Sequence, residues 1–450
     1  MPKFAFTNPT QKYISSMMKT FVTIVLITLT SLLSTAQEEP ANTFGIDIDL
    51  MSRGELRRGG LPADDDGNSE SKAAFILERT RLGLNYERAV LSARVTAQHS
   101  AVWGQAGKGS LNIYEAWAQL RSRSGFFARV GRQVLSYDDE RIIGSNDWAM
   151  AALSHDVLKL GYEYGEHRLH VLGAYNQNAE SVNGGTVYVN GDKPYKTMEL
   201  AWYNFAPVRV PLSVSLLFMN TGMQGWIDDK SHDFLQQLFG SYIKYSPRQW
   251  NVEASFYYQT GKNESGIPIR AWMASAKCSY NPSNRWKIGV GYDHLSGDKY
   301  FAVPPAGAIG LTRHSVIRGF SPIYGSHHKF YGAMDFFYLS TYVNGFTPGL
   351  QNLYFGATYK PRDRVTLDAA YHYYATATDI TDHNVGRTLG HSIEVQAKWN
   401  IIDNVALSTG YTYMHGTEAM ERLKRVEKDH NLHWAWVSFT VNPRLFYVKR

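Results

Sequence analysis

Basic side chains recur at alternate positions of short, partly apolar segments, which places them together on one face of an extended chain. In Leu91–Gln98 every odd position is apolar and every even position is polar, and Arg94 is one of the polar residues. A period of two is typical of a strand whose two faces meet different surroundings. The same parity places these cations on the polar face: Arg79, Arg81, Arg94, Arg121, Arg129, Lys159, Lys244, Lys277, Lys287 and Lys398.

The chemistry that such a face offers is the binding of anions. Arginine binds a carboxylate through a planar pair of hydrogen bonds, and rings of Arg and Lys around a narrow passage raise the local concentration of anions. The acidic residues of the same parity are Glu115, Glu253, Asp293, Asp368 and Glu394. The polar face is therefore predicted to be net basic. The alternative is that the cations only pair with these carboxylates and solvate a wall of weak selectivity.

The stretch Phe126–Gly144 combines this strand pattern with a charged segment. Its first half sets Phe126, Ala128 and Val130 on one side and Phe127, Arg129, Gly131 and Gln133 on the other. Its second half contains Tyr137–Arg141, a charged burst that we do not expect inside a packed core. Strict alternation puts Arg132 on the apolar face, so either Gly131 forms a bulge or the register changes there.

The composition narrows the class of protein. The 450 residues include 29 Tyr and 38 Gly, and the mean hydropathy is −0.32. Beyond the N-terminal region no run approaches the roughly 20 apolar residues of a membrane-spanning helix. Such a chain is typical of a transmembrane β-barrel, in which only every second strand residue faces lipid. The single Cys278 excludes a cysteine-based zinc cluster. The formal charge of +6 without a basic, aromatic cluster gives no reason to expect nucleic-acid binding.

Residues 17–36 have the features of a secretory signal, with Lys19 before an apolar core and Ser34-Thr35-Ala36 as a cleavage site. The alternative is a membrane anchor, but Phe21–Leu33 is too short to span a bilayer. We therefore expect residues 1–36 to be a cleaved extension and signal peptide, and residues 37–450 to form one barrel domain.

Short turns separate the predicted strands in pairs. Eight hairpins give sixteen strands, and a leading strand near 43–52 and a closing strand near 431–441 bring the total to eighteen, an even number that suits a closed barrel. The predicted turns are Glu87-Arg88, Arg123-Ser124, Gly165-Glu166, Pro207–Pro211, Pro247-Arg248, Pro282-Ser283, Pro361-Arg362 and Asp403-Asn404.

Longer polar connections join the strands at the other end, as expected of extracellular loops. The longest ones lie near 53–72, 137–154, 179–194, 298–349, 376–387 and 417–430. The loop at 298–349 is too long for an ordinary connection, so it either folds inward as a constriction or forms a surface loop. Neither His327-His328 nor the acidic run Asp64–Asn68 has the spacing of a complete metal site. We expect no metal and no cofactor.

The motif Gly131–Gly144, GRQVLSYDDERIIG, resembles the alginate-export family of outer-membrane porins. Asn146-Asp147-Trp148 and the segment His327–Asp335 extend the likeness. The resemblance implies a monomeric, passive channel in the outer membrane of a Gram-negative bacterium, with an arginine-lined constriction for a uronic-acid polymer or a smaller uronate. Residues that match the motif are Arg129, Gly131, Arg132, Gln133, Asp138, Asp139, Glu140, Arg141 and Gly144.

Three functions remain open at this stage. The first is a channel for anionic oligosaccharides or polysaccharides such as alginate, or a general diffusion porin with little selectivity. The second is an enzyme on a barrel scaffold, which we do not expect because Ser154 and His155 point to opposite faces of a strand and no better nucleophile–base set appears. The third is a non-conducting structural barrel. The expected partners are outer-membrane lipid, lipopolysaccharide and, for the channel, an anionic sugar.

Overall fold

A computed structural model describes residues 42–59, 72–105, 109–180, 182, 187–188, 194–227, 230–298, 316–322, 324–337, 347–379, 386–424 and 431–449. The predicted signal segment 1–36 and the acidic run Asp64–Asn68 lie outside these residues. Among the described residues, no helix has the length and apolar character needed to cross a membrane.

Almost every described element is a strand. The strands are β1 (Thr43–Arg58), β2 (Lys72–Arg88), β3 (Leu91–Val102), β4 (Ser110–Arg121), β5 (Phe126–Gln133), β6 (His155–Tyr164), β7 (His167–Tyr175), β8 (Thr197–Phe205), β9 (Leu212–Ile227), β10 (Lys230–Tyr245), β11 (Trp250–Lys262), β12 (Pro268–Ser283), β13 (Trp286–Leu295), β14 (Leu350–Arg362), β15 (Val365–Ala375), β16 (Thr388–Ile402), β17 (Val405–Gly416), β18 (Asn431–Val441) and β19 (Arg444–Lys449). The described helices are the single 3-10 turn η2 (His327–Lys329) and the short α2 (Glu418–Lys424).

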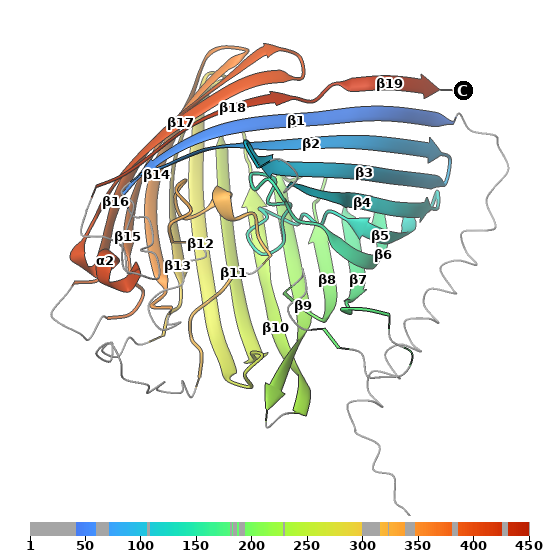
Figure 1. Cartoon of the computed structure of the whole chain (residues 1–450), viewed down its shortest axis with the longest axis horizontal. Coiled ribbons are helices and arrows are strands. Elements are labelled where there is room, and N and C mark those ends of the chain that lie inside the picture. Colours follow the sequence, from blue (N-terminus) through green and yellow to red (C-terminus); the bar gives the residue numbers. More distant parts are fainter. Residues whose placement is uncertain are drawn as a thin grey trace, which may run out of the picture.

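These strands form one antiparallel sheet that closes on itself (Figure 1). β1 pairs with β2 on one side and with β18 and β19 on the other. β18 and β19 are two parts of one final strand, since both pair with β1 and only Asn442 and Pro443 lie between them. The fold is therefore a closed barrel of eighteen strands, which confirms the predicted fold class. Closure leaves each strand paired on both sides, as a lipid environment requires.

The short turns lie at one end of the barrel, and three of them are displaced from their predicted positions. β2 continues through Glu87-Arg88, β12 through Pro282-Ser283 and β14 through Pro361-Arg362, so each turn begins at the following residue. In β12 and β14 the register shifts next to the proline. A bulge removes the need for the N–H that proline lacks, which is why these prolines fit inside a strand.

The alternation along the strands separates an outer from an inner face. Leu82 and Val95 are exposed on the outside, whereas Arg81 and its register partner Gln98 are buried on the inside. The outer apolar face suits contact with hydrocarbon, and the inner face can tolerate polar groups because it lines a lumen.

Two loop segments fill part of that lumen, residues 134–154 between β5 and β6 and residues 316–322 and 324–337 between β13 and β14. In Figure 1 they run inside the ring of strands, coloured cyan and orange. Ile143 is fully buried, and Tyr324 and Tyr331 are each only 2% exposed. The prediction that 137–154 is an ordinary extracellular loop is therefore wrong, and the described part of 298–349 takes the inward alternative.

Candidate functional site

The two inward segments form one structure, which we call the partition (residues 134–154, 316–322 and 324–337). Their backbones pair directly, with a parallel bridge between Ile143 and Tyr324. The Gly144 N–H donates to the Tyr324 carbonyl at 2.9 Å, and the Ser326 N–H donates to the Glu140 carbonyl at 2.8 Å. These bonds satisfy backbone groups that would otherwise be buried without partners.

Two arginines of β2 hold the partition against the first strands. Arg79 donates to the Asp147 carbonyl oxygen at 2.8 Å, and Arg81 lies 2.7 Å from the Asp147 carboxylate. Both also pair with Asp49 of β1, at 3.2 and 3.5 Å. Arg79 and Arg81 face inward, but their charge is already neutralised by two carboxylates. Their geometry supports an anchoring role rather than an open site for a passing anion.

Trp148 is the second anchor on this side. Its ring lies between the Arg53 guanidinium, 3.8 Å from the ring centroid, and the His328 ring, stacked at 3.9 Å. His328 in turn lies 3.0 Å from the Asp335 carboxylate. Trp148 therefore joins β1 to both segments of the partition, and stacked arginine is a favourable neighbour for an indole ring. Among the described residues, no group of three potential metal ligands gathers around this histidine or elsewhere.

Arg141 anchors the partition to the opposite wall. Its guanidinium lies 3.2 Å from Asp139 and 3.1 Å from Asp293 of β13, and it donates to Ser275 of β12 and Tyr331. The side chain is only 4% exposed. Burial alone would lower the Arg141 pKa, but Asp293, Tyr331 and Asp139 hold it well above its ordinary value. The expectation that this charged burst avoids a packed interior is therefore wrong, because each charge meets an opposite one.

Glu140 and Asp138 lie in different environments within the same turn. Burial favours the protonated form of Glu140, yet hydrogen bonds from Lys329, Ser136 and Ser326 lower its pKa. Asp138 accepts a hydrogen bond from the Trp202 indole at 3.0 Å, but burial prevails and raises its pKa to about 6. The acidic cluster therefore fixes the shape of the turn through Glu140 and contributes a group that titrates near neutrality through Asp138.

The remaining motif residues have packing roles. Gly131 has φ of +116°, and a Cβ there would collide with the Ala116 carbonyl. Gly144 packs against Ser326 so closely that it too leaves no room for a Cβ. The Gln133 side chain is fully buried and donates to the Val157 carbonyl at 3.2 Å. The family motif therefore encodes the way in which β5 leads into the partition.

Arg132 lies on the outer face, as strict alternation requires. The pairing of β5 with β4 and β6 shows no register shift at Gly131, so no bulge forms. Instead the guanidinium makes two bonds of 2.8 Å to the Asp156 carboxylate on β6. A paired, half-exposed arginine can be accepted where an unpaired one would be costly.

The cations nearer the short turns are less neutralised. Arg129 and Lys159 are register neighbours on β5 and β6, and Lys244, Glu253 and Lys277 are neighbours on β10, β11 and β12. We call this region the turn-side wall; its inward-facing cations are Arg121, Arg129, Lys159, Arg168, Lys244, Lys277, Lys287 and Lys398. Arg121 pairs with Glu163 at 2.8 Å, whereas Arg129 is held by Gln119 and the Trp117 ring. Other inward acids toward the turns are Glu87, Glu253 and Asp368, besides the Asp47 and Glu115 that pair with Arg94.

Arg94 also lies toward the turns but has two acidic partners. It is 3.0 Å from Asp47 and 2.7 Å from Glu115. Asp47 and Asp49 alternate with Ile46, Ile48 and Leu50, so the parity argument could have placed these two carboxylates inside. Asp147 could not have been placed in this way, because a loop has no period.

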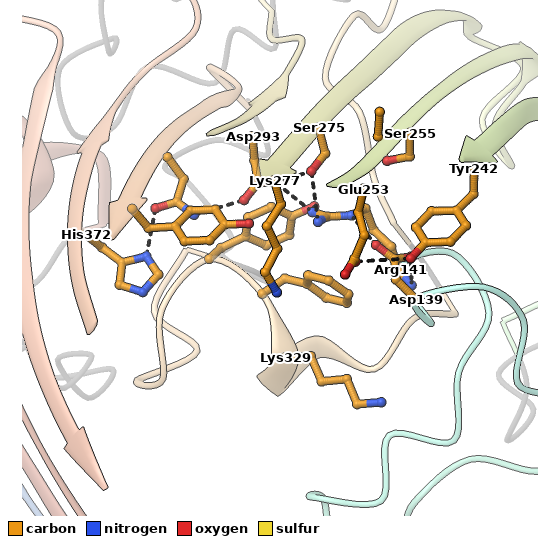
Figure 2. Close-up of a pocket in the computed structure, with 15 residues that line it drawn as sticks. Asp139, Arg141, Tyr242, Glu253, Ser255, Ser275, Lys277, Asp293, Lys329 and His372 are labelled. Atoms are coloured by element: carbon orange, nitrogen blue, oxygen red, sulfur yellow. Dashed lines mark hydrogen bonds and ion pairs between the residues drawn. The ribbon is translucent and has the colours of Figure 1, made fainter. Parts of the chain in front are cut away.

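A cavity of about 230 Å³ lies between the partition and strands β10 to β15. Figure 2 shows Arg141, Asp293 and Ser275 joined on its upper side, and Lys277 and Lys329 extending toward the open space below. Aromatic rings of Phe330, Tyr331 and Tyr354 complete the lining. Cations, carboxylates and aromatic faces therefore meet in one small polar space.

Comparisons with known proteins agree with this architecture. A family model described as alginate export matches residues 88–389, more than half of the chain. No curated protein sequence matches. Similar solved structures include OpdQ of Pseudomonas aeruginosa, at 14% identity and a TM-score of 0.57, with 90% of this chain and 98% of that chain covered.

Two further structures show the same fold. OccK2 (OpdF) of Pseudomonas aeruginosa, solved in complex with glucuronate, has 10% identity and a TM-score of 0.59 and covers 90% of this chain and 98% of its own. A BenF-like porin from Pseudomonas fluorescens Pf-5 has 11% identity and a TM-score of 0.58, with 89% and 99% covered. Identities this low show the fold alone. The family match and the closed barrel place the protein in the outer membrane of a Gram-negative bacterium, and the chain belongs to the alginate export family of outer-membrane channels.

Proposed function

We propose that this outer-membrane porin is a passive, monomeric channel that favours small anionic saccharides and catalyses no reaction. The observation that supports this proposal is the turn-side wall, where inward-facing cations outnumber the carboxylates beside them. Fixed positive charge in a narrow passage with low-dielectric walls raises the concentration of anions there. The glucuronate complex of a barrel of the same fold is consistent with a uronate as the cargo.

The arginines of β2 and β3 contribute less to this selectivity than their number suggests. Arg79, Arg81 and Arg94 each contact at least one carboxylate within 3.2 Å. An anion would have to displace those partners before it could bind. The cations that act on a passing anion are therefore the lysines of β10 to β16, together with Arg129 and Arg168.

The test is the reversal potential of single channels in a KCl gradient across a planar bilayer. The wild type should prefer chloride, and the triple variant Lys244→Gln, Lys287→Gln, Lys398→Gln should lose most of that preference. The matched control removes the same charge from exposed turn residues outside the lumen, Arg209→Gln, Arg248→Gln and Arg285→Gln. It should leave the reversal potential nearly unchanged.

Two results would contradict the proposal. A wild type without anion preference would favour the general diffusion porin, and a wild type without measurable conductance would favour the structural barrel. A second readout is block of the current by oligouronates, which should exceed block by neutral sugars of equal size.

A further inference from the structure

Among the cations that line the cavity, Lys277 is the one without a direct acidic partner. It projects inward from β12 next to Glu253 of β11. Within the described part of the chain, its ammonium group has no hydrogen bond or ion pair. The other two cations of the cavity differ, because Arg141 is bound by two carboxylates and Lys329 by Glu140. A ligand carboxylate would therefore find an available cation at Lys277.

The rest of the lining suits the hydroxyl groups and the apolar face of a sugar ring. Glu253 accepts hydrogen bonds only from the neutral donors Tyr242 and Asn251, so its carboxylate can accept further ones. Phe330 and Tyr354 present ring surfaces to the cavity. A sugar has C–H groups that pack on aromatic rings and hydroxyls that donate to carboxylates, whereas chloride or phosphate uses neither of these features.

We propose that this cavity binds one hexuronate unit, with the sugar carboxylate on Lys277 and its hydroxyls on Glu253. The inference rests on the proposed function, because it assumes that anionic saccharides enter the lumen. The size of the cavity limits the size of the ligand. Pockets for drug-sized molecules have volumes of roughly 300–1,000 Å³, and the cavity of about 230 Å³ is smaller. It accommodates a single sugar ring rather than a polymer strand.

The carboxylates in the cavity make the site favour a uronate over simple anions such as chloride. Asp139 and Asp293 are fully engaged with Arg141, so the local charge is close to balanced. A simple anion gains little in such a place. A uronate gains an ion pair with Lys277 and hydrogen bonds from its hydroxyls to Glu253, few enough in number for release.

The test is a saturation-transfer-difference NMR titration of the detergent-solubilised barrel with glucuronate, and with glucose as the neutral sugar. This measurement reports binding without any need for conductance. Lys277→Gln should weaken glucuronate binding by at least fivefold, whereas the control Lys262→Gln removes an exposed lysine at the end of β11 outside the cavity and should change it less than twofold. Glucose should bind more weakly than glucuronate to the wild type and equally to both variants.

The outcomes separate failure of the cavity site from failure of the proposed function. Equal glucuronate affinity in the two variants, or no saturable signal with the wild type, would overturn the site. Anion preference in the bilayer without glucuronate binding would overturn the site and leave the proposed function standing. Glucuronate binding that depends on Lys277 in a barrel without anion preference would support the site and contradict the proposed function. Circular dichroism and heat-modified migration show whether each variant is folded.

Discussion

The arginines of this barrel lie in very different surroundings. Arg141 is buried between two carboxylates, whereas Arg132 lies half-exposed on the outer face with one. A buried charge that loses its partner keeps its full desolvation cost, but an exposed one recovers water. Removal of an arginine should therefore destabilise the barrel much more at the buried position than at the exposed one.

The first prediction compares these two arginines. Arg141→Ala leaves Asp139 and Asp293 buried without their cation and should destabilise the barrel by about 3–5 kcal/mol. Arg132→Ala should cost about 1 kcal/mol or less, since its ion pair with Asp156 is exposed to solvent. The measurement is the midpoint temperature at which the compact, fast-migrating form on unheated gels is lost. Equal midpoints for the two variants would argue against a buried anchor at Arg141.

The second prediction concerns Asp138, whose pKa burial raises from the ordinary 3.8 to about 6. A carboxyl with a raised pKa stabilises the fold in its protonated form, so stability falls as pH rises from about 4 to about 6 and then levels off. Asp138→Asn keeps an acceptor for Trp202 but cannot ionise. The two proteins should have the same free energy of unfolding at pH 4. At pH 7 the variant should be more stable than the wild type by at most about 3 kcal/mol. The measurement is the free energy of unfolding of both proteins between pH 4 and pH 7. If it changes with pH in the same way for both, Asp138 does not titrate as expected.

At the residue scale, the sequence predicts the face of a side chain but not its partner. Alternation assigns Arg81 and Arg94 to the interior, and the register agrees. Their acidic partners come from β1, β4 and a loop, so pairing depends on which strands meet and where the loop folds. Asp147 shows the limit, because its position follows from tertiary contacts such as the Trp148 stack.

The partition is the element that controls the width of the lumen. It contacts β2 and β3 through Arg79, Arg81 and Gln98, and it contacts the far wall through Gln259 of β11 and Glu394 of β16. A structure attached on both sides crosses the passage rather than lining it. The open cross-section of the lumen therefore depends on these loops and not on the number of strands.

The third prediction follows from this crossing. Replacement of residues 318–335 by a short Gly-Ser linker removes one half of the partition, and single-channel conductance should rise several-fold. The barrel should remain closed because its strand pairing does not use these residues. As a control, a change of the turn pair Asp403-Asn404 to Gly-Gly at the other end should leave conductance unaltered. Unchanged conductance in the loop variant would show that ions pass by a route beside the partition.

Strands could be predicted from the sequence, and the inward loops could not. A strand between lipid and lumen alternates apolar and polar residues, and this period of two can be recognised from the hydrophobicity of the sequence alone. The segment 134–154 has no period, and its charged residues suggest solvent. Its burial depends on partners such as Asp293, which is 152 positions away from Arg141, and no local pattern contains that information.

On the scale of the whole barrel, fixed charge is distributed unevenly along the axis. Cations exceed carboxylates on the turn-side wall, while the partition and β1 to β3 hold nearly balanced pairs such as Arg53 with Glu55. A channel with one charged mouth collects anions more readily from that side.

The fourth prediction is that the current depends on the sign of the voltage. With barrels inserted in one orientation, the current–voltage curve should be asymmetric in 0.1 M KCl, where the screening length is about 10 Å, and nearly symmetric in 1 M KCl, where it is about 3 Å. The triple lysine variant Lys244→Gln, Lys287→Gln, Lys398→Gln should lose the asymmetry at low salt. An asymmetry that persists in 1 M KCl would point to shape rather than charge.

The partition also covers the line along which the sheet closes. Glu55 of β1 accepts a hydrogen bond from Trp434 of β18 at 2.9 Å, and Arg57 reaches the Met334 carbonyl at 3.5 Å. Trp148 of the partition contacts Arg53 of β1 and the rings of Trp434 and Trp436 of β18. These contacts and the Glu55–Trp434 bond bring together strands from both ends of the chain, so they form only after most of the strands have assembled. They must break before β1 and β18 can separate. We therefore expect the partition to slow the separation of β1 from β18, so that part of the barrel's stability in the membrane is kinetic in origin.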